Sequence, residues 1–203
     1  MIILLALFLF VLSLVFAFVE IEIEGKFGWA EKLPTWYRKS KIADLFNGQR
    51  PLSGYFVFMI LFLLVMFHMG FFLGLIWSIA AELQIISYFL IFIAVEDFLW
   101  FVFNPNYGIK NFKKDKIWWH YNCKWIFGLF PADYVVVIII TLLLNYFSSL
   151  LIGNITIFYN YVYSLLIILV LVFLASVLLP KVYKKWYFEL RKKDERKKFN
   201  IFH

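Results

Sequence analysis

Two adjacent acidic residues, Glu96 and Asp97, stand inside the apolar and aromatic run V-E-D-F-L-W-F-V-F-N-P, residues 95–105. Ionisable residues within a membrane span are costly, about 2.5–3.5 kcal/mol for Asp at a helix centre, so they indicate a functional role. A buried carboxyl group beside a second carboxylate favours its protonated form. We therefore predict that Glu96 or Asp97 is the general acid of a catalytic site.

Aromatic and amide side chains near the acid pair are the candidate walls of this site. At helical spacing Trp100 shares a face with both acids, and Asn104 shares the face of Asp97. Aromatic rings stabilise positive charge that develops on a substrate. We predict that the substrate contacts Trp100, Phe101, Asn104 and Trp118.

A metal centre is the second chemistry that these residue types allow. His68, Glu96, Asp97 and His120 are ligand types for zinc or iron. However, His68 is expected about 10 Å deeper in the membrane than Glu96, at 1.5 Å per helical residue. His120 falls among lysines at helical spacing. We therefore assign no metal site and keep these four residues only as an alternative ligand set, and the sequence identifies no cofactor.

Three alternating glutamates, Glu20, Glu22 and Glu24, follow the first apolar run. They would all point one way if the segment were extended. Two interpretations stay open. They solvate the helix end and pair with nearby Lys or Arg, or they form a cation or substrate site.

The elements that must position these residues are membrane helices. The chain has 203 residues and is 64% hydrophobic, against about 45–50% in soluble domains. A helix crosses the bilayer core in about 20 apolar residues. We predict an all-α polytopic bundle, a single membrane domain over residues 1–203, with five spans at about 2–19, 55–80, 83–103, 134–153 and 161–180.

Finer features of these spans are also expected. The first run has no basic segment before it, so we expect it to be retained as a helix. Glu82 marks the turn between the second and third spans. Gly70 and Gly74 form a G-x-x-x-G pair that permits close helix packing. The polar stripe of the fourth span is expected to hydrogen bond between helices, and consists of Thr141, Asn145, Ser148 and Ser149.

Every Lys and Arg lies in one of three segments: six in loop 20–54, five in loop 104–133 and nine in the tail 181–203. Because cytoplasmic loops accumulate these residues, we predict a multi-pass protein of the cell membrane with its N-terminus outside and its C-terminus inside. The basic tail should bind anionic lipid headgroups. We also expect an interfacial cytoplasmic helix over residues 115–127.

Two short segments resemble known proteins. The strings G-Q-R-P-L-S-G-Y, residues 48–55, and V-E-D-F-L-W-F-V-F-N-P resemble those of small prokaryotic polytopic membrane proteins, which implies no activity. Residues 95–101 also resemble the proline-x-Glu-Glu/Asp segment of membrane-embedded lycopene cyclase domains, with Val95 near the family's proline. This second resemblance covers seven residues and implies that acidic residues protonate a polyene while rings stabilise the cation.

Three functions remain open from the sequence. The first is an enzyme that acts on a lipidic or isoprenoid substrate by acid catalysis at a cytoplasmic-side pocket. The second is a non-enzymatic subunit or assembly partner, whose buried acids pair within an oligomer or with another protein. The third is a proton or ion transporter that uses His68 and the acid pair. A net charge of +7 on so apolar a chain points to lipid headgroups, and we expect no nucleic acid partner.

Overall fold

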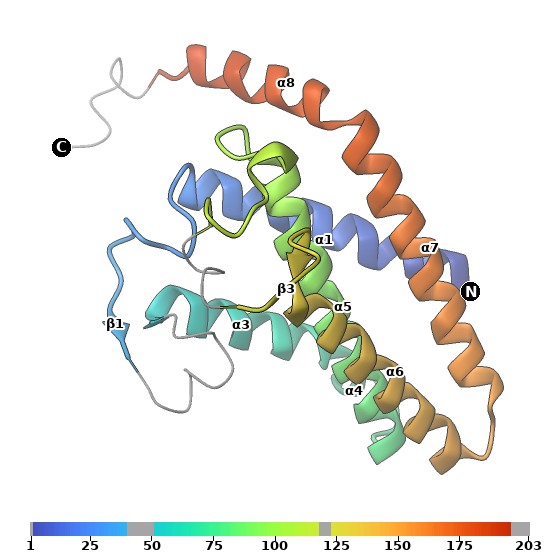
Figure 1. Ribbon diagram of the computed structural model, residues 1–203. Helices are drawn as coiled ribbons and strands as arrows, with labels where there is room; N and C mark the ends of the chain where they lie inside the picture. The colour runs from blue at the N-terminus through green and yellow to red at the C-terminus, as the bar shows by residue number, and fades with distance from the viewer. Residues whose placement is uncertain (1, 40–50, 118–122, 196–203) are drawn as a thin grey trace.

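The computed structural model describes residues 2–39, 51–117 and 123–195, and this part of the chain is mostly helical (Figure 1). Four helices are long and apolar enough to cross a membrane: α1 (Ile2–Glu24), α5 (Ile79–Phe103), α6 (Ala132–Ile152) and α7 (Thr156–Leu178). The predicted class, a helical bundle built on long apolar helices, is confirmed.

Shorter elements complete the described part of the chain. The short helices are α3 (Gly54–Phe67), α4 (Met69–Phe72), α8 (Pro180–Lys192) and the 3-10 turn Ile109–Asn111. Two antiparallel pairs of two-residue strands join β1 (Tyr37–Arg38) to β2 (Leu52–Ser53), and β3 (Trp125–Ile126) to β4 (Phe130–Pro131).

Helix α5 is the centre of the bundle, with α1 and α7 parallel to it and α6 antiparallel. The C-terminal ends of α1 and α5 meet where the rings of Phe18 and Phe103 lie 5.3 Å apart. Just beyond them, Nδ2 of Asn104 donates a 2.7 Å hydrogen bond to the carbonyl of Gly25. Helix α1 is thus a packed member of the bundle, and Ala6 of its first turns is fully buried.

The polar stripe of α6 confirms the predicted interhelical hydrogen bonding at Ser148, whereas the side chains of Thr141, Asn145 and Ser149 donate to carbonyl groups of α6 itself. All four residues of the stripe are buried. The Ser148 hydroxyl donates to the carbonyl of Ala80 at 2.9 Å and accepts from Gln84 at 2.9 Å. These bonds fix the start of α5 against the end of α6.

The segment 55–80 is not one continuous helix. Helix α3 ends at Phe67, α4 lasts one turn, and a non-helical connection leads to α5, which begins at Ile79. The glycine pair explains the break: Gly74 has a φ of +104°, and the Leu75 side chain occupies the space beside Gly70. The packing role predicted for this pair is therefore wrong. The turn assigned to Glu82 is wrong as well, because Glu82 lies in the first turn of α5.

The expected helix over residues 115–127 is not formed by the described residues of this segment, 115–117 and 123–127. Trp125 and Ile126 form strand β3, and the chain then reverses at Phe127 and Gly128, both with positive φ. Residues 118–122, with Trp118 and His120, lie outside the described residues. The strongly amphipathic helix is instead α8 in the basic tail. It starts at Pro180, which suits a first helical position because it has no N–H to leave unpaired.

One end of the bundle, here called the basic end, is where α1, α5 and α7 finish and α3 and α6 begin. The described Lys and Arg all follow or precede these helix ends, on the segments 25–53, 104–131 and 179–195. In Figure 1 the loops of the basic end lie together, and α7 and α8 form an arc along one side of the molecule.

Candidate active site

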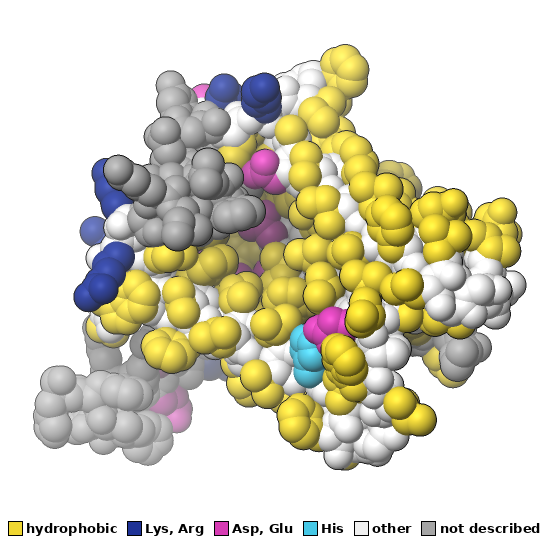
Figure 2. Space-filling model, turned by 90° about the horizontal axis from the view of Figure 1, so that it is seen from below, with side chains coloured by type: hydrophobic (Ala, Val, Ile, Leu, Met, Phe, Trp, Pro, Cys, Tyr) yellow, Lys and Arg dark blue, Asp and Glu magenta, His cyan; other side chains and the backbone are white. Residues whose placement is uncertain are grey.

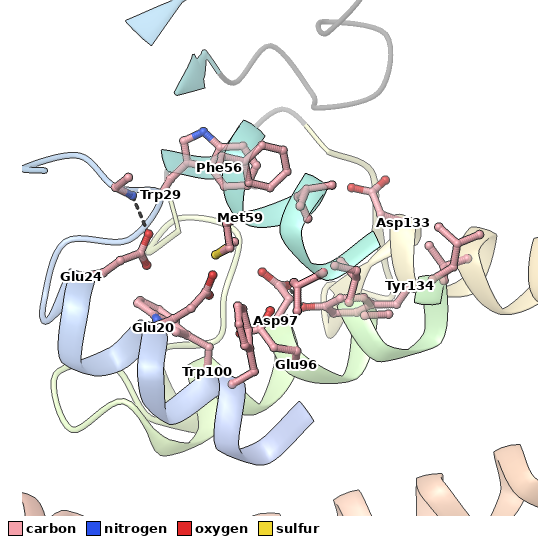
Figure 3. Close-up of a pocket in the computed structure, with 18 of the residues that line it drawn as sticks. Glu20, Glu24, Trp29, Phe56, Met59, Glu96, Asp97, Trp100, Asp133 and Tyr134 are labelled. Carbon is pink, nitrogen blue, oxygen red and sulfur yellow. Dashed lines mark hydrogen bonds between the residues drawn. The ribbon is translucent and has the colours of Figure 1, made fainter. Parts of the chain in front are cut away.

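A cavity of about 510 Å³ opens between α1, α3, α5 and α6 near the basic end. This volume falls within the range of about 300–1,000 Å³ that small-molecule sites occupy. Figure 2 shows acidic side chains deep in a hollow of an otherwise apolar face, and Figure 3 shows the lining residues. The cavity is therefore the candidate site of the described part of the chain.

Helix α1 contributes two carboxyl groups, Glu20 and Glu24, to the cavity wall. The helix continues to Glu24, so these residues stand one turn apart on one face. Glu22 lies on another face and pairs with Arg191 of α8 at 2.6 Å. The segment is helical rather than extended, so the three glutamates do not share one face. Of the two open interpretations, Glu22 matches the first, and Glu20 and Glu24 lie where the second requires. The Oε1 atom of Glu24 accepts a 2.6 Å hydrogen bond from the backbone N–H of Ala30.

Helix α5 contributes the predicted pair, Glu96 and Asp97, and both line the cavity. Glu96 is only 5% exposed, and its Oε1 atom has no hydrogen-bond partner among the described residues. Glu20 on α1 is also buried and lines the same cavity. Two buried carboxyl groups from different helices thus face one cavity, an arrangement that can hold a proton beside an apolar ligand.

Helix α6 contributes Asp133 and Tyr134 from its first turn. The Tyr134 hydroxyl donates a short hydrogen bond to Oδ2 of Asp97. The thiol of Cys123 donates to Oδ2 of Asp133 at 3.2 Å. Sequence reasoning missed both α6 residues, because their contacts depend on how α6 enters the bundle.

Helix α3 forms the opposite wall, mostly with apolar side chains. Phe56 packs on Trp29 with ring centroids 4.7 Å apart. The indole N–H of Trp29 donates to the carbonyl of Pro51 at 2.9 Å. The backbone N–H of Tyr55 donates to the Thr35 hydroxyl at 2.9 Å. These contacts hold the start of α3 against the loop that follows α1, and so fix the width of the cavity.

The predicted substrate-binding residues fall into three groups. Trp100 lines the cavity. Phe101 and Asn104 do not line it: Phe101 is 1% exposed and packs on Phe112 at 5.0 Å, and Asn104 joins α5 to the end of α1. Trp118 lies outside the described residues.

The four possible metal ligands are not brought together in the described part of the chain. Nε2 of His68 lies 2.8 Å from Glu82, and Glu82 precedes Glu96 by fourteen residues, about 21 Å along α5. Figure 2 shows the histidine and its acidic partner apart from the hollow. His120 lies outside the described residues. Within these residues no group of three or more His, Cys, Asp or Glu can hold a metal ion.

The cavity changes character along its length. Its carboxyl groups lie toward the basic end, while Phe16, Leu63 and Leu90 line its deeper part toward the middle of the helices. No Lys, Arg or His is among the described lining residues. No family model, curated protein or solved structure matches this chain. Its function is therefore inferred from the chemistry of the cavity.

Proposed function

We propose that the protein is an integral membrane enzyme that acts on a lipidic substrate with an unsaturated, isoprenoid-like chain by acid catalysis. The observation that carries this proposal is the pair of buried carboxyl groups, Glu20 and Glu96, on the wall of a largely apolar cavity. A carboxylic acid held beside a hydrocarbon, with bulk water kept out, is the arrangement that protonation of a carbon–carbon double bond needs.

The proposed reaction begins with proton transfer from the Glu96 carboxyl group to one carbon of a double bond. The π electrons form the new C–H bond, and the neighbouring carbon becomes a carbocation. Loss of a proton from an adjacent carbon to the carboxylate restores the acid and gives a shifted double bond. If a second double bond of the chain first attacks the cation, its π electrons form a new C–C bond, and loss of a proton from the resulting cation gives a ring. Glu20 supplies a second carboxyl group on the same cavity wall.

Two further features of the wall support stabilisation of the carbocation. The rings of Trp29, Phe56 and Trp100 line the cavity, and aromatic faces attract cations. Asp97 accepts the hydrogen bond from Tyr134 and places a carboxyl oxygen near the developing positive charge, where fixed dipoles and charges act most strongly.

The proposed placement in the cell membrane has five crossings. Helix α3 begins at the basic end, whereas α5 begins at the opposite end, so α3, α4 and their connection together cross the same thickness as α5. The gathering of Lys and Arg at the basic end supports its placement in the cytoplasm. In this orientation the N-terminus is outside, the C-terminus is inside, and the cavity lies in the cytoplasmic leaflet.

The test is deuterium transfer in D2O from the purified protein in lipid discs to geranylgeraniol, a neutral isoprenoid. Mass spectrometry should detect deuterium on carbon. Glu96→Gln and Glu20→Gln should lower the rate about 10²–10⁴-fold, the usual contribution of a general acid. Glu22→Gln is the matched control on the same helix, outside the cavity, and should keep the wild-type rate.

Two outcomes contradict the proposal. One is wild-type protein that transfers no deuterium, and the other is a Glu96→Gln variant with an unchanged rate. If these variants instead lose a defined oligomer that the wild-type protein forms in native mass spectrometry, the acids belong to an assembly interface.

A further inference from the structure

We infer that the cavity selects a single-chain amphiphile with a positively charged ammonium headgroup, and that it rejects lipids with a phosphate headgroup. This inference names the substrate class and rests on the proposed function only in assigning the cavity to the substrate.

The charge of the lining has one sign. Glu24, Asp97 and Asp133 approach the cavity from three different elements, the end of α1, the middle of α5 and the start of α6 (Figure 3). None of the described lining residues carries a positive charge. An ammonium group therefore finds acidic side chains on three sides, whereas a phosphate group finds no cationic side chain among the described lining residues.

Aromatic faces surround the same region. Trp29 packs on Phe56 beside Glu24, and Trp100 lies one turn after Glu96 on α5. Carboxylates combined with Trp and Phe rings are the usual recognition chemistry of ammonium ligands. The same rings stabilise the carbocation of the proposed reaction.

Two buried polar atoms in the lining lack a partner within the described part of the chain: Oε1 of Glu96 and the hydroxyl oxygen of Tyr55. Glu96 is 95% buried, since only 5% of it is exposed. Buried polar atoms are nearly always hydrogen-bonded, so those without a partner mark the positions that a ligand satisfies. These atoms lie on opposite walls, on α5 and α3, which places the polar part of the ligand between them.

The deeper part of the cavity fits a hydrocarbon chain. Leu63 lies two turns beyond Tyr55 on α3, about 12 Å along the helix. A volume of about 510 Å³ suits one chain. Val136 both lines the cavity and is 50% exposed on the lipid-facing side of α6, so the cavity reaches the bilayer between α3 and α6. A chain can enter there sideways from the membrane.

The experiment compares three probes with one tail: geranylgeranylamine, geranylgeraniol and geranylgeranyl phosphate. Binding to wild-type protein in phosphatidylcholine discs is measured by native mass spectrometry, with empty discs as the partition control. The amine should bind at least tenfold more tightly than the alcohol, and the phosphate should show no specific binding. Equal binding of amine and phosphate overturns the inference.

Variants locate the selectivity. Asp97→Asn combined with Asp133→Asn should remove the tenfold preference for the amine over the alcohol. Glu24→Gln changes the cavity lining on a different helix and should lower the preference for the amine about threefold. It keeps the inference testable if the double variant does not fold. Glu22→Gln removes the same charge outside the cavity and should leave the preference intact. An unchanged preference in both cavity variants also overturns the inference.

The two proposals fail separately. Deuterium transfer to geranylgeraniol without preference for the amine refutes the substrate class and leaves acid catalysis standing. Preference for the amine without deuterium transfer to either probe refutes acid catalysis and leaves an ammonium-binding site.

Discussion

The hydroxyl group of Tyr134 donates a hydrogen bond to Oδ2 of Asp97, and this contact joins the first turn of α6 to the middle of α5. A hydrogen bond to an ionised group is worth about 1.5–3 kcal/mol. The contact also fixes the direction of the Asp97 carboxyl group at the cavity wall, next to Glu96.

Tyr134→Phe should lower the free energy of unfolding by about 1.5–3 kcal/mol, because the hydrogen bond from Tyr134 to Asp97 is lost. It should also slow deuterium transfer, since the carboxyl group of Asp97 is no longer held toward the substrate. Denaturation in mild detergent measures the first effect. Tyr159→Phe is the control, because Tyr159 is 53% exposed on α7, and an equal loss in both variants would disprove the role of the contact.

Gly54→Ala should displace the start of α3 and deform the cavity. A Cβ atom at Gly54 would lie 2.5 Å from Nε1 of Trp36 and 2.8 Å from the Thr35 hydroxyl. Overpacking of this kind costs about 1–3 kcal/mol. We expect lower thermal stability together with weaker probe binding. Phe58→Ala, on the same helix at a 68% exposed position, should leave binding intact, and unaltered binding in Gly54→Ala would show that α3 does not set the cavity width.

The acid pair of α5 could be predicted from the sequence because an ionisable residue inside an apolar run is conspicuous by itself. Glu20 and Glu24 could not be placed in the same way. Their alternation with isoleucine has the period of a strand, and the chain is helical there because Ile21 is fully buried in the bundle. The spacing of four residues between Glu20 and Glu24 places both side chains on one face of a helix, and this spacing is the sequence signal that identifies them.

Other features depended on contacts that local patterns do not encode. Asp133 and Tyr134 follow a proline and precede an apolar run, and only the crossing of α6 over α5 brings them to the cavity. A glycine pair in an apolar run is compatible either with close helix packing or with a break in the helix. The structure has the break after α3, because Gly74 takes a positive φ of +104° that a helix does not allow.

Tyr183→Ala should detach α8 from the bundle, whereas Tyr183→Phe should change little. The Tyr183 ring stacks on Phe18 at 4.2 Å and is 7% exposed, and truncation of a buried ring costs about 3–5 kcal/mol. Burial raises the pKa of the Tyr183 hydroxyl, which has no hydrogen-bond partner in the described part of the chain. Its removal therefore leaves no other group unsatisfied.

Arg191→Ala is the comparison for the docking of α8. Its ion pair with Glu22 is partly exposed, at 38% and 50% for the two side chains, and such pairs contribute about 0–1 kcal/mol. Limited proteolysis should release the tail faster in Tyr183→Ala than in Arg191→Ala. The reverse order would show that the ion pair, and not ring packing, holds α8.

Glu82→Ala should lower stability without affecting the cavity. Glu82 lies 2.8 Å from Nε2 of His68 and accepts from the Trp77 indole at 3.1 Å, so its removal leaves two groups without their partner. Since the Glu82 side chain is 28% exposed, we expect a loss of about 0.5–1.5 kcal/mol, the value of an ordinary hydrogen bond. Glu82→Gln keeps an acceptor and should lose less. Deuterium transfer should be unchanged in both variants, because Glu82 lies about 21 Å from Glu96 along α5. Slower transfer in Glu82→Ala would contradict this prediction. It would connect this end of the bundle to the cavity, as a proton relay from His68 requires.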